Sequence, residues 1–213
     1  MGTLKEELRR KAVHIALGLW VLYPLVVDRT GAFFILAFFL LLTVFVFRPH
    51  RWSAPFVAMA REEDYGYGIL VGPLIYILSV TVCVILYPVF ISATSIGIMA
   101  FGDGFATLVG KKWGRIRNPL NRNKTLEGSA AFVVCAFAAT ALAMSVTAPL
   151  EGARDILALA LAGSLAGAVT EMVPFENHHN TSFLQRIIID DNFFVPLVGG
   201  AAMYALYHFC IIC

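Results

Sequence analysis

Long apolar runs separated by short polar segments dominate the chain. A helix that crosses a bilayer needs about 20 mostly apolar residues. Seven runs meet this requirement: 12–28, 31–47, 68–87, 88–109, 128–148, 154–173 and 193–213. The third and fourth form one stretch, and Tyr87-Pro88 is its natural break because proline disfavours helix at the residue before it. We therefore predict an all-α, polytopic integral membrane bundle of about seven helices, with residues 1–213 as a single domain.

Most of the charged residues fall on one side of this predicted bundle. If the spans alternate and the N-terminus is cytoplasmic, every lysine and arginine except Arg29 and Arg154 lies on the cytoplasmic side. Positive charge favours the cytoplasmic loops of membrane proteins. We therefore expect a cytoplasmic N-terminus, an outer C-terminus, and polar chemistry at the cytoplasmic face.

The composition supports the membrane class. The chain is 59% hydrophobic and only 14% charged, whereas soluble domains are about 45–50% apolar and about 25% charged. A net charge of +2 gives no reason to expect a nucleic-acid partner. The four cysteines lie in apolar runs without a Cys-x-x-Cys spacing, so we expect neither disulfides nor a zinc site. The first apolar run lacks a cleavage site after it, so no signal peptide is expected.

One acid interrupts the fourth apolar run. Asp103 stands between Gly102 and Gly104. An ionised acid inside a membrane costs about 2.5–3.5 kcal/mol, so such residues face a cavity, a partner or a metal. The two glycines would let the backbone approach a ligand closely. A helix cap at a kink is the alternative role for Asp103.

A basic loop, KKWGRIRNPLNRNK, follows this acid and ends in KTLEGS. Thr125 suits a helix N-cap, and the exposed N–H groups of a helix start attract phosphate. Lys124 adds a mobile positive charge. Glu127 makes sense in such a site if it binds Mg²⁺ or holds a lysine in place. The alternative is that the loop only anchors the protein at the membrane surface.

The last cytoplasmic loop supplies hard oxygen ligands. Glu171 precedes it, and Asp190-Asp191-Asn192 ends it. Carboxylate and amide oxygens suit Mg²⁺ beside phosphates, although Asp191 and Asn192 would also suit an ordinary N-cap. His178 and His179 have no third ligand at short spacing, so we expect loop residues there and not a zinc site.

The N-terminal segment ELRRKAVHIALG is basic and amphipathic. It could simply attach to anionic lipid head groups. Lys11 and His14, however, are three residues apart and share one helical face, which could point into the bundle on the substrate side. The acids at 62–64 are expected to be solvated, and Gly163-x-x-x-Gly167 is expected to allow close helix packing.

In their order, these motifs resemble those of the polyprenol kinase family, which comprises dolichol kinases, phytol kinases and CTP-dependent diacylglycerol kinases. The similarity extends over nearly the whole chain, through these segments: ELRRKAVHIALG, AREEDYGYG, MAFGDGFATLVGKKWGR, KTLEGS, EMVP and DDNFFVPL. The small size is similar to that of the prokaryotic, phytol-kinase-like branch. We accordingly expect an integral protein of a prokaryotic cytoplasmic membrane.

The resemblance implies transfer of a γ-phosphoryl group, commonly from CTP, to the hydroxyl of an alcohol dissolved in the membrane. It also implies that Asp103 and the segment Lys124, Glu127, Gly128 and Ser129 belong to the nucleotide site. The acceptor could be phytol, geranylgeraniol, a longer polyprenol or diacylglycerol, and ATP could replace CTP.

Motifs and resemblance together define a hypothesis for the site. The expected catalytic residues are Asp103, Lys124, Glu127 and Asp191. The expected Mg²⁺ ligands are Asp103, Glu171, Asp191 and Asn192. Nucleotide binding is expected at Gly102, Gly104, Lys111, Lys112, Arg115, Lys124, Thr125, Gly128 and Ser129. Lys11 and His14 are expected to lie on the side of the alcohol.

Three alternatives remain open. A membrane cytidylyltransferase would use the same CTP, Mg²⁺ and basic loop but would attack the α-phosphorus and make a CDP-lipid. An ion or solute transporter would use Asp103 and Glu171 as ion sites within the membrane, although no polar track crosses the predicted bilayer. A structural membrane protein would tolerate the loss of Asp103.

Overall fold

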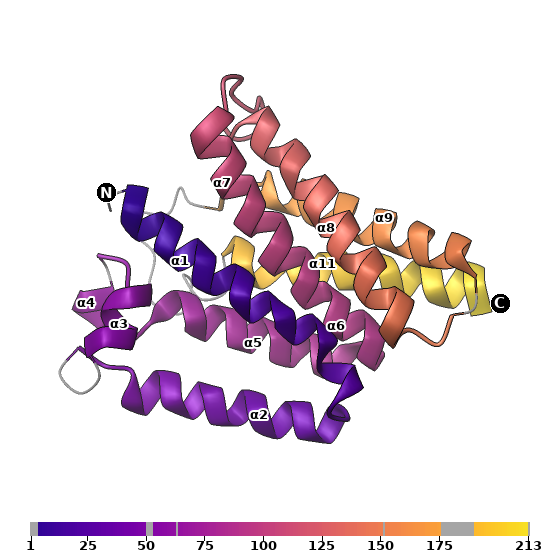
Figure 1. Cartoon of the computed structure of the whole chain (residues 1–213), viewed down its shortest axis with the longest axis horizontal. Helices are drawn as coiled ribbons and strands as arrows, with labels where there is room; N and C mark the ends of the chain where they lie inside the picture. Colours follow the sequence, from indigo (N-terminus) through magenta and orange to yellow (C-terminus); the bar gives the residue numbers. More distant parts are fainter. Residues whose placement is uncertain (1–3, 50–52, 63, 151, 176–189, 213) are drawn as a thin grey trace.

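The structure is a computed structural model that describes residues 4–49, 53–62, 64–150, 152–175 and 190–212. Within these ranges every regular element is helical, and no β-strand occurs. The helices pack together as one bundle, with the N-terminal α1 running beside α5 and α7 (Figure 1). The predicted all-α class is confirmed.

The helices follow the predicted apolar runs. Their bounds are α1 (Leu4–Leu17) continuing as η1 (Gly18–Leu25), α2 (Arg29–Leu41) continuing as η2 (Leu42–Val46), α3 (Ser53–Met59), α4 (Asp64–Tyr67), α5 (Val71–Leu86), α6 (Val89–Gly97) continuing as η3 (Ile98–Asp103) and α7 (Gly104–Trp113), α8 (Leu126–Thr147), α9 (Ala153–Glu171), and α11 (Asp191–Leu206) continuing as η5 (Tyr207–Ile212). The predicted break at Tyr87-Pro88 is confirmed, because α5 ends and α6 begins on either side of it.

Within the described residues, five helical stretches are long and apolar enough to cross a membrane: Arg29–Val46, Val89–Trp113, Leu126–Thr147, Ala153–Glu171 and Asp191–Cys210. The apolar helix α5 is shorter, with 16 residues. The first helix begins with a charged segment before it becomes apolar. A count of seven spans and the orientation of the termini stay predictions.

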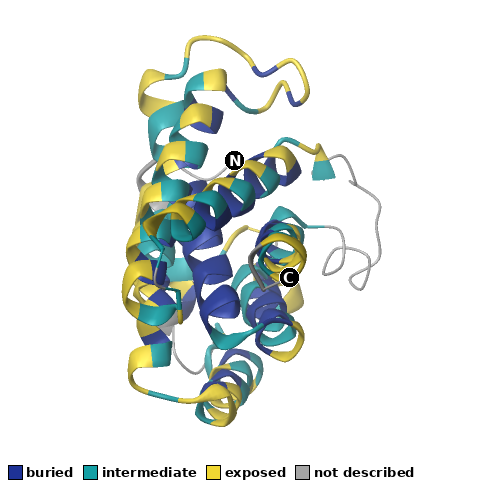
Figure 2. Cartoon of the chain, turned by 90° about the vertical axis from the view of Figure 1, so that its right-hand side faces the viewer, coloured by how far each residue is buried: buried dark blue, intermediate teal, exposed yellow. Residues whose placement is uncertain are grey.

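The continuous helix α6–η3–α7 forms the centre of the bundle. It contacts α8, α9 and α11, and most of its first two turns and its middle are buried (Figure 2). Its middle section, η3, is π-helical and ends at Asp103. Such π-helical turns are rare and occur often at functional sites.

Small residues let α9 approach the centre closely, as predicted for Gly163 and Gly167. A Cβ atom at Gly163 would lie 2.8 Å from the side chains of Ile98 and Met203. A Cβ atom at Gly167 would lie 2.7 Å from Ile98 Cγ2. These distances are shorter than van der Waals contact allows, so a side chain at either position would force Ile98 or Met203 to move.

The expectation that residues 62–64 are solvated is wrong for Asp64. This side chain is buried at the start of α4. Its carboxylate accepts hydrogen bonds from the backbone N–H groups of Arg61 at 2.8 Å and Val71 at 3.1 Å. Burial raises the pKa of Asp64, and the two backbone donors only partly oppose this shift. Asp64 therefore joins the loop before α4 to the start of α5.

Candidate active site

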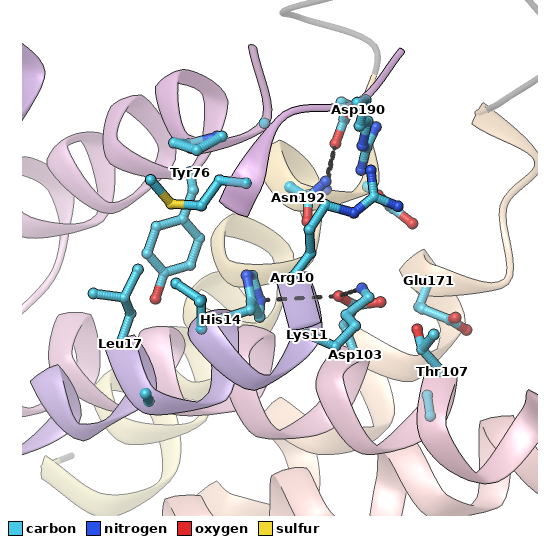
Figure 3. Close-up of a pocket in the computed structure, with 18 of the residues that line it drawn as sticks. Arg10, Lys11, His14, Leu17, Tyr76, Asp103, Thr107, Glu171, Asp190 and Asn192 are labelled. Carbon is cyan, nitrogen blue, oxygen red and sulfur yellow. Dashed lines mark hydrogen bonds and ion pairs between the residues drawn. The ribbon is translucent and has the colours of Figure 1, made fainter. Parts of the chain in front are cut away.

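A cavity of about 1600 Å³ is lined in part by the basic loop, and Figure 3 shows other residues that line it. Side chains from α1, α2, α5, α7, the basic loop, α9 and α11 line it. Its charged lining residues are Arg10, Lys11, Arg61, Asp103, Lys111, Arg115, Arg117, Lys124, Glu171, Asp190 and Asp191. Its other part is apolar and lies between α1–η1, α2 and α5. One cavity thus combines an ionic end with an apolar end.

Asp103 is paired with the N-terminal helix. The Lys11 ammonium makes an ion pair with the Asp103 carboxylate, and His14 Nε2 lies 3.9 Å from Asp103 Oδ2. Lys11 and His14 share one face of α1, which packs against η3 and α7. The side chain of Asp103 is only 9% exposed, so the pairing provides the partner that an acid in an apolar run needs.

Lys124 makes the second charged cluster. Its Nζ donates to the Glu171 side chain at 2.7 Å, to the Glu171 carbonyl oxygen at 2.6 Å, and to Asp191 Oδ2 at 3.2 Å. Burial would lower the pKa of Lys124, but the Asp191 and Glu171 carboxylates outweigh it and hold the pKa above its ordinary value. Lys124 is therefore a permanent positive charge inside the cavity.

Asp190 is the N-cap of α11. Its Oδ1 accepts hydrogen bonds from the backbone N–H of Asn192 at 2.8 Å and from Asn192 Nδ2 at 2.6 Å. Burial, assisted by the charge of Asp191, raises the pKa of Asp190 to about 6. Because Asp190 does the capping, the side chain of Asp191 is available to Lys124. The capping role considered for Asp191 and Asn192 is therefore wrong.

Backbone hydrogen bonds fold the basic loop back onto itself. Asn118 N–H donates to the Lys124 carbonyl at 3.0 Å, and Leu126 N–H donates to the Ile116 carbonyl at 2.9 Å. The predicted N-cap is confirmed, since Thr125 Oγ1 accepts from Gly128 N–H at 3.2 Å. The fold of the loop directs Lys111, Arg115, Arg117 and Lys124 toward one cavity.

Two asparagines support this loop, and sequence analysis missed both. Asn118 and Asn121 are almost fully buried. Asn118 Nδ2 donates to Ser129 Oγ at 3.1 Å, while Asn121 Oδ1 accepts from the backbone N–H of Asn123. Ser129 thus holds the loop as well as lining the cavity. The sequence feature that could have predicted this support is the presence of two asparagines in a loop that is otherwise mainly basic.

Glu127 lies outside the cavity lining. Glu127 is only partly exposed, and its carboxylate accepts hydrogen bonds from the backbone N–H groups of Arg115 at 2.9 Å and Ile116 at 3.2 Å. In the structure Glu127 therefore does not pair with a lysine, and it does not join the acids that line the cavity. Lys112 also points elsewhere, with Nζ 4.5 Å from the centre of the Trp113 ring.

Replacing Glu127 with alanine tests this positioning role. We expect the KM for the nucleotide to rise by about tenfold or less, because two ordinary backbone hydrogen bonds are lost, while kcat stays near that of the wild type. Steady-state kinetics measure both constants. A loss of kcat comparable to that of a substitution at Lys124 would contradict the positioning role.

Gly102 and Gly104 pack against other helices and do not line the cavity. A Cβ atom at Gly102 would lie 2.9 Å from the Phe132 ring, and one at Gly104 would lie 2.5 Å from Ile15 Cγ1. The close approach that these glycines permit is between helices, and the structure offers no support for the predicted contact with nucleotide. Gly128 does line the cavity. It also packs tightly, because a Cβ atom added at Gly128 would lie 2.9 Å from the Ala106 carbonyl oxygen.

Gly102→Ala separates packing from nucleotide binding. We expect it to lower the free energy of unfolding by about 1–3 kcal/mol, as overpacked cores do, with the KM for nucleotide unchanged in the folded protein. Thermal unfolding in detergent measures the first quantity. Gly66→Ala is the matched control, because an added Cβ there meets nothing within 4 Å. A Gly102→Ala protein as stable as this control, but with weakened nucleotide binding, would contradict the packing role.

The residues at the charged end suit a magnesium ion that also contacts substrate phosphates. No group of three or more His, Cys, Asp or Glu side chains in the described ranges forms a metal cage by itself. Mg²⁺ usually keeps several waters and binds through one or two carboxylates plus phosphates. Glu171 Oε2 is buried without a hydrogen-bond partner in the same ranges, and Asp191 is its neighbour across Lys124. These two carboxylates fit such a site, while Lys11 already pairs with Asp103.

Tyr76 and Trp20 were also missed. Both line the cavity, and Tyr76 lies beside His14 in the close-up (Figure 3). Aromatic residues in apolar runs carry no pattern that separates a cavity wall from a lipid-facing surface. Glu176, His178 and His179 lie outside the described residues.

Comparisons with known proteins come from curated sequences. No family model matches the chain, and no solved structure matches it significantly. The chain is 29% identical over 224 residues to a rice protein named "Probable phytol kinase 1, chloroplastic", covering 99% of this chain and 68% of the rice protein.

Two further relatives agree with this match. The "Farnesol kinase, chloroplastic" of Arabidopsis thaliana is 29% identical over 97% of this chain and 67% of its own length. A soybean protein named "Probable phytol kinase 3, chloroplastic" is 31% identical over 91% of this chain and 61% of its own length. Membership of the prokaryotic branch stays a prediction. Named phytol and farnesol kinases are similar to this chain along nearly its whole length, which supports the predicted resemblance to the polyprenol kinase family.

Proposed function

We propose that this protein is a membrane kinase that transfers the terminal phosphoryl group of a nucleoside triphosphate to the hydroxyl of a prenyl alcohol. The observation that carries the proposal is the cavity with one ionic and one apolar end. A reaction between a water-soluble polyanion and a lipid alcohol requires such a cavity, because the two substrates must meet at one point. The names of the relatives, phytol and farnesol kinases, support the same reaction.

The ionic end supplies the charge that phosphoryl transfer needs. This reaction depends on positioning and on neutralising the phosphate oxygens more than on covalent chemistry by the protein. Lys124 would contact the terminal phosphate, and Lys111, Arg115 and Arg117 would cover the remaining phosphates from the loop. The start of α8, capped by Thr125, adds backbone N–H groups that favour an anion.

Glu171 and Asp191 would hold Mg²⁺ beside Lys124. The ion would neutralise and orient the phosphate oxygens when bound. Both carboxylates already converge on one cation, Lys124 Nζ, at 2.7 and 3.2 Å. Asn192, on the first turn of α11, provides an amide at the same wall of the cavity.

Asp103 would act on the hydroxyl of the alcohol. It lies with Lys11 and His14 between the ionic end and the apolar end (Figure 3). There it would orient the hydroxyl and take its proton as the oxygen attacks the terminal phosphorus. The bond from that phosphorus to the bridging oxygen breaks, and the nucleoside diphosphate leaves. We also propose CTP as the preferred donor and the cytoplasmic side as the location of the site.

A donor and acceptor panel tests this function. The purified protein in detergent receives CTP, ATP, GTP or UTP, with phytol, farnesol or diacylglycerol, in Mg²⁺ or in a chelator. We expect prenyl monophosphate as the product, with CTP the best donor and no product in the chelator. Diacylglycerol as the only acceptor would overturn the prenyl assignment. Flux of ions into vesicles without any lipid phosphate would favour the transporter alternative.

A further inference from the structure

Residues of α1–η1, α2 and α5 line the apolar part of the cavity and form a groove between these three helices. Leu17 and Trp20 line one side, Leu36 and Phe39 the other, and the buried Val80 comes from α5. Leu17 is 48% exposed and Phe39 is 44% exposed, although both line the cavity. The groove, which we name the tail groove, therefore opens sideways, on the apolar surface that α2 presents outward.

Two buried polar atoms lie where the tail groove meets the ionic end. His14 Nε2 and Tyr76 Oη are shielded from solvent and have no hydrogen-bond partner among the described residues. Their rings meet edge to face with centroids 5.1 Å apart, and the close-up places both between Leu17 and Asp103 (Figure 3). Buried polar atoms in folded proteins almost always have a partner, so this pair points to a ligand.

A hydroxyl group is the natural complement of these two atoms. An alcohol can donate one hydrogen bond and accept others. Before the reaction it would donate to His14 Nε2 and accept from the Tyr76 hydroxyl. As the oxygen attacks, its one proton would leave this hydrogen bond and pass to Asp103. A carboxylate or phosphate could not donate to His14, and an alkyl chain would satisfy neither atom. The position lies beside Asp103, since His14 Nε2 is 3.9 Å from Asp103 Oδ2.

We propose that the tail groove is the acceptor site, and that His14 and Tyr76 hold the hydroxyl of a prenyl alcohol whose chain lies between α1–η1 and α2. This inference rests on the proposed function and adds the residues that select the acceptor. A single flexible chain with one terminal hydroxyl matches an apolar groove with its hydrogen-bonding pair at the ionic end. The sideways opening lets the alcohol enter from the bilayer without crossing water.

The hydroxyl contacts are tested by His14→Gln and Tyr76→Phe in the full-length protein. His14 Nε2 and Tyr76 Oη make no hydrogen bond to a described residue, so loss of either atom should leave the protein folded. Thermal unfolding in detergent checks that both variants fold. We expect the KM for phytol to rise about tenfold in each, as for loss of one ordinary hydrogen bond. The KM for the nucleotide should stay unchanged. His208→Gln, in η5 and away from the cavity, is the matched control.

The tail groove is tested by Leu17→Trp. Leu161 on α9 is equally exposed, at 48%, but does not line the cavity, so Leu161→Trp is its matched control. We expect Leu17→Trp to raise the KM for phytol and to change the KM for a short-chain alcohol much less. Equilibrium binding of radiolabelled phytol to the two variants, without nucleotide, measures the same effect independently of turnover.

Two results would overturn the acceptor site. The first is an unchanged KM for phytol in His14→Gln, Tyr76→Phe and Leu17→Trp while the wild type makes phytyl phosphate. The second is equal phytol binding by the wild type, Leu17→Trp and Leu161→Trp. If phytol binding depends on Leu17 but no alcohol receives phosphate, the groove is retained as a lipid site and the kinase function fails. A diacylglycerol preference that Trp20→Phe abolishes would instead assign the groove to a glycerolipid, because Trp20 Nε1 is a buried donor without a described partner.

Discussion

Lys124→Met is expected to lower kcat by about 10²–10³-fold, the usual loss when one preorganised donor to a charged transition state is removed. Lys124 is the cation that joins the basic loop to Glu171 and Asp191. Without it, two carboxylates face the phosphates with no positive charge between them. Single-turnover transfer of labelled phosphate measures the chemical step directly.

Stability must be separated from catalysis in this variant. Removing one partner of a buried ion pair costs about 3–5 kcal/mol, so Lys124→Met should also unfold at lower temperature. The double variant Lys124→Met with Glu171→Gln removes one of the two unpaired charges and should recover part of the stability but not the rate. Lys112→Met is the control, because Lys112 contacts the Trp113 ring outside the cavity. A double variant with restored turnover would show that Lys124 serves only the fold.

Asp103→Asn is expected to reduce kcat by about 10²–10⁴-fold, the range for loss of a positioned proton acceptor. The amide keeps the size of the side chain but cannot accept the proton, and Lys11 loses its ionic partner. The KM for the nucleotide should change much less, because the basic loop binds it. Rates and KM values at fixed pH, on protein with verified thermal unfolding, provide the measurement.

The Lys11–Asp103 pair also predicts non-additive effects. Residues in direct contact show coupling, whereas distant ones add. The double variant Lys11→Met with Asp103→Asn should therefore be no slower than the worse single variant. Asp155→Asn combined with Asp103→Asn should be additive, because Asp155 lies in the first turn of α9, at the far end from Glu171. Glu171 lines the same cavity as Asp103 and is about 24 Å from Asp155 along the helix. Additive losses in the Lys11 pair would mean that the two residues act at separate steps.

The helices were predictable because each apolar run has the length that a bilayer or a buried helix requires. The boundary at Tyr87-Pro88 follows from proline sterics, which are local. The partner of Asp103 was not predictable in the same way. Lys11 lies 92 positions away in the chain, and only the packing of α1 against η3 and α7 brings the two together. Sequence analysis could place Lys11 and His14 on one face, but not opposite this acid.

The candidate site also contains residues that the sequence predicts and contacts that only the tertiary packing reveals. Lys124, Glu171 and Asp191 were each singled out by residue type at the cytoplasmic ends of predicted spans, and the structure brings them together. Glu127 and Gly102 were assigned to ligands because acids and glycines in a basic motif suit nucleotide binding. Their observed contacts are with backbone N–H groups and an aromatic ring, which sequence spacing does not reveal. Tyr76 was missed because a tyrosine in an apolar run is common.

The most direct test of phosphoryl transfer at this site compares CTP labelled at the γ-phosphorus with CTP labelled at the α-phosphorus. Phytol or phytyl monophosphate is the acceptor, and the wild type is assayed beside Lys124→Met and Lys112→Met. We expect γ-label on phytyl phosphate with the wild type and Lys112→Met, and little with Lys124→Met. No label should reach the lipid from the α position. Label from the α-phosphorus on a lipid monophosphate would show a cytidylyltransferase, and γ-label transfer unaffected by Lys124→Met would contradict the assignment of the site.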